Sequence, residues 1–369
     1  MAVYKIFPSK DATIYSDTPN KNTGLDEILD VSVFPTSLDG YALASRFLIQ
    51  FSSDDISSTL DSKVQDKQWD AYLRTFIANV DGLNLDTIVE AYPVSQSWDM
   101  GIGKYLYNPE VTTGVSWTWK DYKDGNAWFT SSTAFNPNTT GSWFISSSIG
   151  GGTWYTNYGA SQSFSYYGDK DINLKVTPTV GAWYSSSLNN NGFILKQQVE
   201  FNTGSVYDTN LKYFSRDTHT IYPPCLEIRW RDYEFNTGSS GITILNTTPA
   251  TIALDENPGT FYPSSVNRFR VNSRPEYPTR VFSTASYYVQ NYYLPTSSYY
   301  AIKDLDTNEY VIEFDDLYTQ LSADATGSYF DLYMNGLEPE RYYSILIKTS
   351  LNGNVLVFSN DYYFKVING

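Results

Sequence analysis

Ser97-Trp98-Asp99 and Val115-Ser116-Trp117-Thr118-Trp119-Lys120 together hold three of the nine tryptophans. Two interpretations compete: an aromatic platform for a ligand, or the hydrophobic centre of a β-sandwich. In a strand, Trp117 and Trp119 would point to the same side, because side chains alternate. Paired large aromatics on one strand face are usually core, because each ring buries a large area. We therefore expect these tryptophans to be core.

Short runs with strand character flank these segments on both sides. Most alternate apolar and polar residues, which is typical of half-buried strands. Aromatic residues make up 17% of the chain and charged residues only 18%, and aromatic side chains favour pleated surfaces. The expected strands of this first block are 11–16, 28–33, 45–51, 69–78, 87–94, 171–176, 192–196 and 225–230, with a short helix or turn within 53–69. This spacing predicts an all-β fold, a jelly-roll-like β-sandwich.

A second block of strands follows a polar linker, Phe235-Asn236-Thr237-Gly238-Ser239-Ser240-Gly241. Segments of this composition are typical of domain boundaries. Strands are expected at 310–314, 329–334, 343–348 and 362–366, whereas the Pro-rich stretch 247–300 is expected to be irregular. The chain is therefore divided into a sandwich domain (1–232), a linker (233–246) and a smaller β-sandwich with an irregular N-terminal stretch (247–369).

The chain carries a net charge of −15, from 25 basic and 40 acidic residues. Binding to a nucleic-acid backbone needs clustered Lys and Arg, so this balance argues against it. Cys225 is the single cysteine, which excludes an intrachain disulfide. No apolar run approaches the ~20 residues of a membrane-spanning helix, and residues 1–8 lack the apolar core of a signal peptide. We expect a soluble chain with no nucleic-acid partner and no membrane insertion.

The first block resembles the DNRLRE-type module, a β-sandwich related to some carbohydrate-binding modules. The matching motifs follow the family's order from about residue 9 to 231. They are Asp11-Ala12-Thr13-Ile14-Tyr15-Ser16 with Asn22-Thr23-Gly24 and Leu29-Asp30-Val31, Arg46-Phe47-Leu48-Ile49-Gln50-Phe51, Trp98 with Val115-Ser116-Trp117, Asp171-Ile172-Asn173-Leu174-Lys175-Val176-Thr177 with Val180, Trp183 and Gly192-Phe193-Ile194-Leu195, and Phe214-Ser215-Arg216-Asp217 with Pro223-Pro224-Cys225-Leu226. The resemblance implies that Trp98 and Trp117 are core residues.

The chain departs from that family between the two tryptophans. The family has only a few residues there, whereas this chain has the segment 99–114, which we call the insert. The Ser-, Gly- and aromatic-rich segment 126–164 is also long and is expected to form surface loops or short hairpins. Function usually lies in such added loops. Tyr105 and Tyr107 of the insert are therefore candidate contact residues.

The last block resembles a fibronectin type III or immunoglobulin-like domain. The motif is Leu337-Glu338-Pro339-Glu340-Arg341-Tyr342-Tyr343-Ser344-Ile345-Leu346-Ile347, in which Tyr343 matches the tyrosine-corner residue. Its hydroxyl is expected to bond a backbone group upstream, which is a structural role. A sandwich module joined to such a domain, without a signal peptide or disulfides, resembles virion structural proteins of tailed bacteriophages.

Residues that could support catalysis or metal binding are scarce. The one histidine, His219, lies in a loop without a Gly-x-Ser-x-Gly elbow, and a zinc site needs several His or Cys ligands. Gly150-Gly151-Gly152 lacks the Lys of a phosphate loop and is expected to be a flexible turn. Close carboxylate pairs lie near strand ends and turns, where Asp normally bonds the backbone. These pairs are Asp54/Asp55, Asp304/Asp306 and Asp315/Asp316. We predict no enzyme activity, catalytic residue, cofactor or metal.

Aromatic side chains in the loop-like sequence are further candidates for contact with a partner or a glycan. They are Trp128, Trp143, Trp154, Tyr155 and Tyr158. Sugar binding needs exposed aromatic faces beside amide or acid side chains, whereas loop aromatics of a virion protein would bury against a neighbouring subunit. The sequence favours a non-enzymatic structural protein of a tailed-phage virion (tail, neck or head decoration), assembled in the host cytoplasm through contacts with other virion proteins. The alternative is a carbohydrate-binding module or adhesin that recognises a cell-surface polysaccharide.

Overall fold

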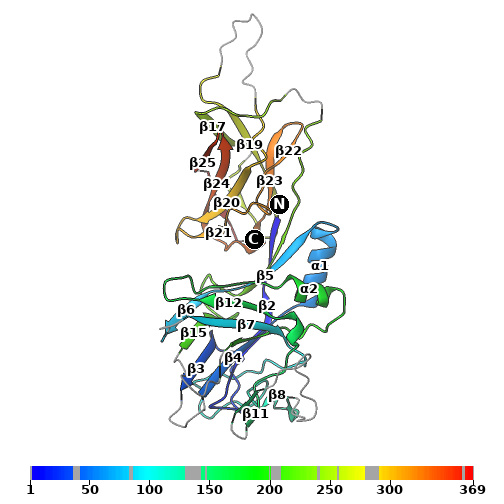
Figure 1. The fold of residues 1–369 in the computed structure, drawn as a ribbon, viewed down its shortest axis with the longest axis vertical. Coiled ribbons are helices and arrows are strands. Elements are labelled where there is room, and N and C mark those ends of the chain that lie inside the picture. Colours follow the sequence, from blue (N-terminus) through cyan, green and yellow to red (C-terminus); the bar gives the residue numbers. More distant parts are fainter. Residues whose placement is uncertain are drawn as a thin grey trace, which may run out of the picture. The chain divides into compact units, whose positions relative to one another are not determined.

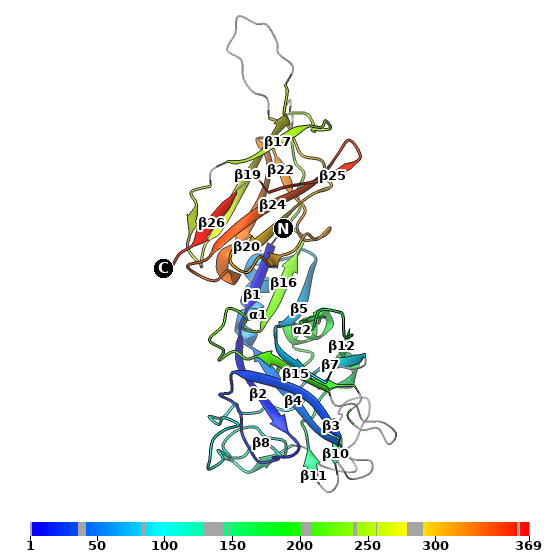
Figure 2. The same ribbon diagram turned by 90° about the vertical axis from the view of Figure 1, so that its left-hand side faces the viewer.

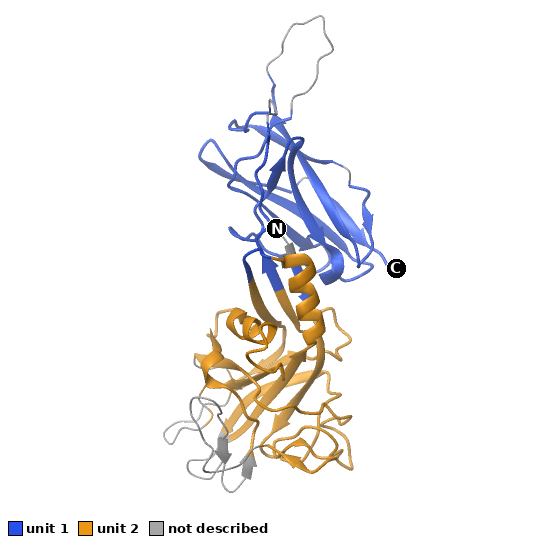
Figure 3. Ribbon diagram, turned by 90° about the vertical axis from the view of Figure 1, so that its right-hand side faces the viewer, with its two compact units in different colours: residues 1–5, 66–69, 228–369 blue, residues 6–65, 70–227 orange. Residues whose placement is uncertain are grey.

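A computed structural model of the chain describes residues 2–35, 42–82, 86–128, 143–145, 148–198, 200, 209–238, 242–255, 257–278, 291–359 and 362–368. The chain folds into two compact units (Figure 3). Unit 1 comprises residues 1–5, 66–69 and 228–369, and unit 2 comprises residues 6–65 and 70–227. Strands make up most of the regular secondary structure of both units, so the predicted all-β sandwich fold is confirmed (Figure 1).

The main sheet of unit 2 has the strand order β12-β7-β14-β4-β3-β15-β6, with β2 paired to β4. Its strands are β2 (Pro8–Tyr15), β3 (Ile28–Pro35), β4 (Ala42–Phe51), β6 (Ile77–Asp81), β7 (Thr87–Pro93), β12 (Ala160–Phe164), β14 (Phe193–Gln197) and β15 (Thr209–Phe214). The pairs are antiparallel, and β2, β4 and β3 lie side by side in Figure 2. This order brings β15 against β3, although well over 150 residues separate them in the chain.

A second sheet has the order β1-β16-β5-β13. Its strands are β1 (Ala2–Ile6), β5 (Trp69–Thr75), β13 (Ile172–Lys175) and β16 (Cys225–Trp230), and the division between the units falls within β1, β5 and β16. Two short strand pairs join β8 (Trp119–Asp121) to β9 (Asn126–Ala127) and β10 (Trp143–Ile145) to β11 (Ser148–Gly150).

Short helices occupy the connections of unit 2. They are α1 (Ser53–Thr59), its π-helical continuation η1 (Leu60–Val64), the 3-10 turn η2 (Thr156–Tyr158) and α2 (Thr177–Tyr184). The side chain of Ser52 caps α1 by accepting from the backbone N–H of Asp55, which satisfies a donor that the first helical turn leaves free. Of the short helix or turn expected within 53–69, the structure has the helix. None of the described helices is long and apolar enough to cross a membrane.

Trp98 and Trp117 belong to the core of unit 2, as the sequence predicts. Both are buried in a cluster with aliphatic side chains such as Leu48 and Ile194. Trp119 differs, because its ring is only half-buried and its indole N–H donates to Asn20 Oδ1 at 2.9 Å. The chain bends at residues 117 and 118, and the strand β8 begins only at Trp119. The expectation that the two tryptophans share one strand is therefore wrong.

A buried ion pair crosses this core. Arg46 Nε and Nη2 donate to the two carboxylate oxygens of Glu200 at 2.9 and 2.6 Å, and both side chains are at most 1% exposed. The guanidinium lies 4.7 Å from the Trp117 ring and 5.3 Å from the Trp154 ring. Burial of a charge is tolerated where a bidentate partner satisfies it. We interpret this pair as structural.

The glycine segment 150–152 is held against the same core. Arg46 Nη1 donates to the carbonyl of Gly151, and Gly151 N–H donates to the Trp117 carbonyl at 2.7 Å. Gly151 has a φ of +86°, and a Cβ there would collide with the Arg46 guanidinium. Glycine is therefore needed for close packing. The sequence predicts a flexible turn here, whereas these hydrogen bonds hold the turn in place.

Unit 1 is a sandwich of two sheets. One has the order β17-β19-β23-β22, and the other has the order β18-β26-β24-β20-β21 with β25 paired to β24. The elements are β17 (Ala250–Asp255), β18 (Thr260–Phe261), β19 (Val266–Pro275), β20 (Ser298–Asp304), β21 (Tyr310–Ile312), β22 (Ser322–Asp324), β23 (Gly327–Tyr333), the 3-10 turn η3 (Met334–Gly336), β24 (Tyr342–Leu351), β25 (Asn354–Phe358) and β26 (Tyr363–Val366). The stretch 247–300, expected to be irregular, thus contains β17, β18 and β19. In β19, Phe269, Val271 and Ser273 are buried on one side, which is the alternation of a half-buried strand.

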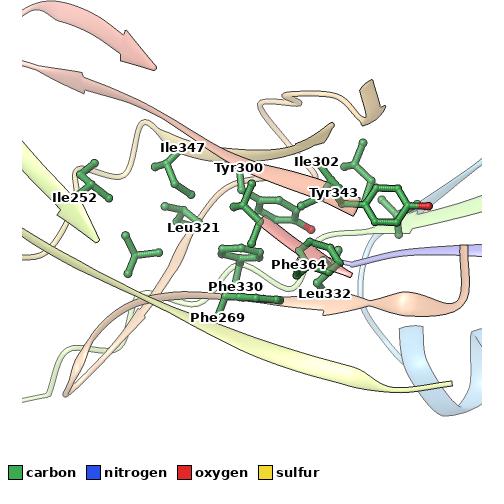
Figure 4. Close-up of a cluster of buried hydrophobic side chains, with 14 of the residues drawn as sticks. Ile252, Phe269, Tyr300, Ile302, Leu321, Phe330, Leu332, Tyr343, Ile347 and Phe364 are labelled. Atoms are coloured by element: carbon green, nitrogen blue, oxygen red, sulfur yellow. The ribbon is translucent and has the colours of Figure 1, made fainter. Parts of the chain in front are cut away.

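Aromatic stacking joins the two sheets of unit 1 (Figure 4). Phe330 of β23 stacks on Phe269 of the neighbouring β19, with ring centroids 5.2 Å apart, and on Tyr300 of β20 in the other sheet, at 4.2 Å. Tyr343 is also buried here, and its hydroxyl donates to the Glu338 carbonyl at 3.0 Å. The upstream backbone bond predicted for Tyr343 is confirmed.

Candidate functional site

A pocket with a volume of about 460 Å³ lies in unit 2. This size falls within the range of ~300–1,000 Å³ that is usual for ligand sites. The strands β3, β15 and the beginning of β4 line the pocket, together with Tyr15 at the end of β2 in the same sheet. Asp17, the turn before β3 and residues 105 and 106 of the insert complete the lining.

Alternation along β3 builds the strand side of the pocket. Leu29, Val31 and Val33 are buried in the interior of unit 2, so the residues between them point the opposite way. Those that line the pocket are Ile28, Asp30, Ser32 and Phe34. The antiparallel register places Lys212 of β15 opposite Asp30 and Asn210 opposite Ser32. The pocket therefore has a carboxylate, an amide and a hydroxyl on a rigid sheet.

Asp30 is the most deeply placed acid of the pocket. Its side chain accepts from Ser45 Oγ at 3.2 Å, and Ser45 Oγ lies 2.6 Å from Ser32 Oγ. Burial raises the pKa of the Asp30 carboxyl to about 6, while the charge of Lys212 and the serine hydroxyls act in the opposite direction. At neutral pH the group is mainly a carboxylate that little water reaches, which makes it a strong acceptor for a donor group in the pocket.

Asn210 supplies an acceptor that the protein leaves unused. The residue is only 7% exposed, and its Oδ1 has no hydrogen-bond partner among the residues that the structure describes. A buried polar atom without a partner is costly and is rare in folded proteins. Asn210 lines the pocket, but this oxygen itself has almost no accessible surface.

The insert is fastened to the sandwich by one buried side chain, Asn22. Its Nδ2 donates to the carbonyls of Met100 and Val115, each at 2.8 Å, and its Oδ1 accepts from Gly103 N–H at 2.7 Å. Asn22 N–H also donates to the Val111 carbonyl at 2.9 Å. These four bonds reach both ends of the insert. The insert is therefore a fixed loop, held by the turn that precedes β3.

Tyr105 of the insert contributes an aromatic wall to the pocket. Its ring lies 4.9 Å from the Tyr15 ring, and its backbone N–H donates to both carboxylate oxygens of Asp26 at 3.1 Å. Burial raises the pKa of Asp26, and the bond from Tyr105 N–H opposes this rise. The Lys21 ammonium lies 4.5 Å from the centre of the Tyr105 ring. The tyrosine is thus placed by main-chain and side-chain contacts together.

The same insert exposes large apolar side chains. The exposed fractions are 65% for Ile102, 36% for Tyr105, 90% for Leu106 and 44% for Tyr107. Scattered exposed apolar residues are ordinary on a protein surface, whereas a group of them on one loop makes that loop a candidate contact surface. This group of four residues is called the insert surface below.

Carboxylates dominate the charge of the pocket. Asp17, Asp26, Glu27 and Asp30 line it, against the single cation Lys212. Within the described ranges, no group of three or more His, Cys, Asp or Glu side chains lies close enough together to hold a metal ion.

The candidate contact residues from the sequence are not all brought together. Tyr105 lines the pocket and Tyr107 lies on the insert surface. Trp128 and Trp154 are buried in the core around Trp117, whereas Tyr155 and Tyr158 are half-buried in or beside η2. Trp143 begins β10, but its side chain lies outside the described part of the chain.

The remaining candidate chemical groups have structural surroundings. The side chain of His219 is 89% exposed, and its Nε2 lies 3.9 Å from a carboxylate oxygen of Glu27. Asp304 Oδ1 accepts from the backbone N–H groups of residues 306 and 307, and Asp315 Oδ1 accepts from those of residues 317 and 318. The prediction that the paired carboxylates bond the backbone is confirmed for Asp304 and Asp315.

Sequence reasoning did not single out Tyr15, Asp26, Asp30, Asn210 or Lys212 as a site. One signal was present, because Asp30 is polar on a strand whose opposite side carries Leu29 and Val31. Alternation shows that Asp30 points away from the core. It does not show that β15 and the insert enclose the space in front of it.

No protein-family model matches the sequence, and no curated protein sequence matches it. Among solved structures, the chain is similar to a DUF4785 family protein from Legionella pneumophila, with 8% sequence identity and a TM-score of 0.16. The match covers 99% of this chain and 62% of that protein, so the chain spans about three fifths of its length. A TM-score of this size carries no argument about fold or function.

Proposed function

We propose that this chain is a non-enzymatic structural protein of a tailed-phage virion, acting through protein–protein contacts that the insert makes with a neighbouring virion protein. The observation that carries the proposal is the insert surface. A loop held by buried hydrogen bonds displays Ile102, Tyr105, Leu106 and Tyr107 to solvent.

Two physical arguments favour docking of a protein on this surface. Covering exposed apolar side chains is favourable, at roughly 25 cal/mol for each Å² removed from water. A loop that is already fixed loses little conformational entropy on binding, so more of this gain remains as affinity. Aromatic side chains at the centre of an interface typically supply much of the binding energy, and Tyr105 and Tyr107 would have this role.

The assignment to a virion rests on the module pairing expected from the sequence. The resemblance to a DNRLRE-type module and to an immunoglobulin-like domain supports it. The bond from the Tyr343 hydroxyl to the Glu338 carbonyl agrees with the second of these resemblances.

A particle-incorporation experiment tests the proposal. The double change Ile102→Asp and Tyr107→Asp places charges on the insert surface, and neither residue lines the pocket. A tagged variant, produced in infected cells, should be depleted about tenfold or more from purified particles relative to the unchanged chain, because burying unpaired charges weakens an apolar interface. Mass spectrometry of the particles measures this. The matched control is Tyr167→Asp, since Tyr167 is 95% exposed in the turn after β12.

Both variants change exposed residues, so both are expected to fold. Equal incorporation of the double variant and the control would contradict docking through the insert. Absence of the unchanged chain from particles would overturn the assignment to a virion.

A glycan-binding role is the second candidate, because Tyr15 and Tyr105 stand beside Asp30 and Asn210 in one pocket. Aromatic faces next to amide and acid groups are what sugar binding needs. A glycan array tests it with Tyr105→Ala, against Tyr107→Ala as the control outside the pocket. Binding that Tyr105→Ala alone abolishes would favour this role, and no binding by the unchanged chain would count against it.

A further inference from the structure

We propose that the pocket of unit 2 binds a basic side chain, an arginine or a lysine, of the protein that docks on the insert surface. This inference rests on the proposed function and deepens it, because it names the chemistry of the partner at a specific place. The insert links the two features, since Tyr105 and Leu106 belong both to the pocket and to the insert surface.

The balance of charge selects a cation. Glu27 is partly neutralised by Lys104, whose Nζ lies 3.4 Å from its carboxylate. Lys104 and Lys21 also act on Asp26, which leaves Asp17 and Asp30 with Lys212 as the one cation among the residues that line the pocket. Like charges held around a partly enclosed space raise one another's energy, and a bound cation relieves that cost.

The balance of hydrogen-bonding groups selects a ligand rich in donors. The four carboxylates that line the pocket only accept hydrogen bonds. A guanidinium offers five N–H donors and no acceptor, and an ammonium offers three donors. A sugar hydroxyl both donates and accepts, so it matches such a lining less completely. The excess of carboxylates in the lining therefore favours a basic side chain over a neutral sugar.

The aromatic rings of Tyr15 and Tyr105 also favour a cation. The Tyr15 and Tyr105 rings pack at 4.9 Å with a tilt of 53°, and aromatic faces attract cations. Lys21 of the chain itself already lies 4.5 Å from the centre of the Tyr105 ring. The aliphatic stem of an arginine or lysine would pack on such rings while its charged end reaches Asp30.

Titration with a matched pair of small probes tests the inference. Nα-acetyl-arginine amide and Nα-acetyl-citrulline amide have nearly the same shape, but citrulline carries no charge. In the full-length chain labelled with ¹⁵N, the arginine probe should shift the amide resonances of Tyr105, Asn210 and Lys212 in a saturable way. The citrulline probe should leave them unchanged.

Variants locate the binding site. Asp30→Asn keeps the shape of the side chain and removes its charge, so the Kd of the arginine probe should rise about tenfold, as for the loss of one charge-assisted hydrogen bond. The matched control is Asp124→Asn, because Asp124 is an exposed carboxylate that does not line the pocket. Its Kd should equal that of the unchanged chain.

Equal shifts with the two probes, or shifts only outside the pocket, would overturn the inference. Shifts at Tyr105 and Asn210 produced by N-acetylglucosamine but not by the arginine probe would also overturn it, in favour of a glycan site. If Asp30→Asn failed to fold, the two probes on the unchanged chain would still decide. Failure here is separable from failure of the proposed function, because the incorporation experiment changes Ile102 and Tyr107, which lie outside the pocket.

Discussion

At the scale of single residues, Asp11 is a buried acid that the proposed interactions do not use. It lies in β2 and is 1% exposed, and its Oδ2 accepts from the backbone N–H of Arg216 at 2.7 Å. Burial raises the pKa of Asp11 to about 7, against the lowering effect of that hydrogen bond, and the nearby Asp217 raises it further. The folded state therefore holds a proton that the unfolded chain releases near pH 4.

This difference predicts how stability depends on pH. Since the folded-state pKa is the higher one, the contribution of Asp11 to the free energy of unfolding falls as pH rises from about 4 to about 7. Asp11→Asn cannot ionise, and its amide oxygen can still accept from Arg216. Urea unfolding between about pH 5 and about pH 8 should show a shallower decline for Asp11→Asn than for the unchanged chain.

In Asp11→Asn, the free energy of unfolding should still decline somewhat as pH rises, because the pKa of Asp30 is also raised, to about 6. The exposed carboxylate Asp124 provides the control, and Asp124→Asn should keep the full slope. An unchanged slope in Asp11→Asn would show that Asp11 does not carry this dependence.

At the scale of elements, the insert is an added loop with a defined structure. Gly101, Gly103 and Gly114 pack so closely around Asn22 that a Cβ on any of them would collide with neighbouring atoms. Gly101 and Gly114 also have φ values of +74° and +91°, which L side chains rarely adopt. Close packing and the bonds of Asn22 together determine where the insert surface is displayed.

Removing the Asn22 side chain should release the insert. Asn22→Ala leaves the carbonyls of Met100 and Val115 and the N–H of Gly103 without their partner. Buried groups left unpaired cost about 1–3 kcal/mol each, so the free energy of unfolding should fall by roughly 3 kcal/mol. Hydrogen exchange at the Gly103 and Tyr105 amides should become faster.

The control is Asn20→Ala, which removes only an exposed bond from the Trp119 indole. It should leave hydrogen exchange in the insert nearly unchanged. If Asn22→Ala left exchange at Gly103 as slow as in the unchanged chain, the insert would owe its order to other contacts.

Local sequence patterns predict part of this arrangement. Alternation along 28–33 predicts β3 and the direction of Asp30, and the motif around Tyr343 predicts its bond to the backbone. The pocket depends on long-range register, because Lys212 meets Asp30 only when β15 pairs with β3. Asn22 likewise donates to the carbonyl of Val115, which lies 93 residues away in the sequence. A single sequence carries no signal for such contacts between distant segments.

At the scale of the whole molecule, the chain comprises two all-β units with an excess of acidic residues. The insert surface and the pocket both belong to unit 2. The central claim is that unit 2 docks onto a neighbouring protein through the insert, with a basic side chain of that neighbour in the pocket.

A cryo-EM map of a particle that contains this chain would show whether unit 2 docks in this way. The map is predicted to show a neighbouring protein covering Ile102, Leu106 and Tyr107, with an arginine or lysine side chain reaching Asp30. A map in which the insert surface faces open solvent in every copy of the chain would contradict it.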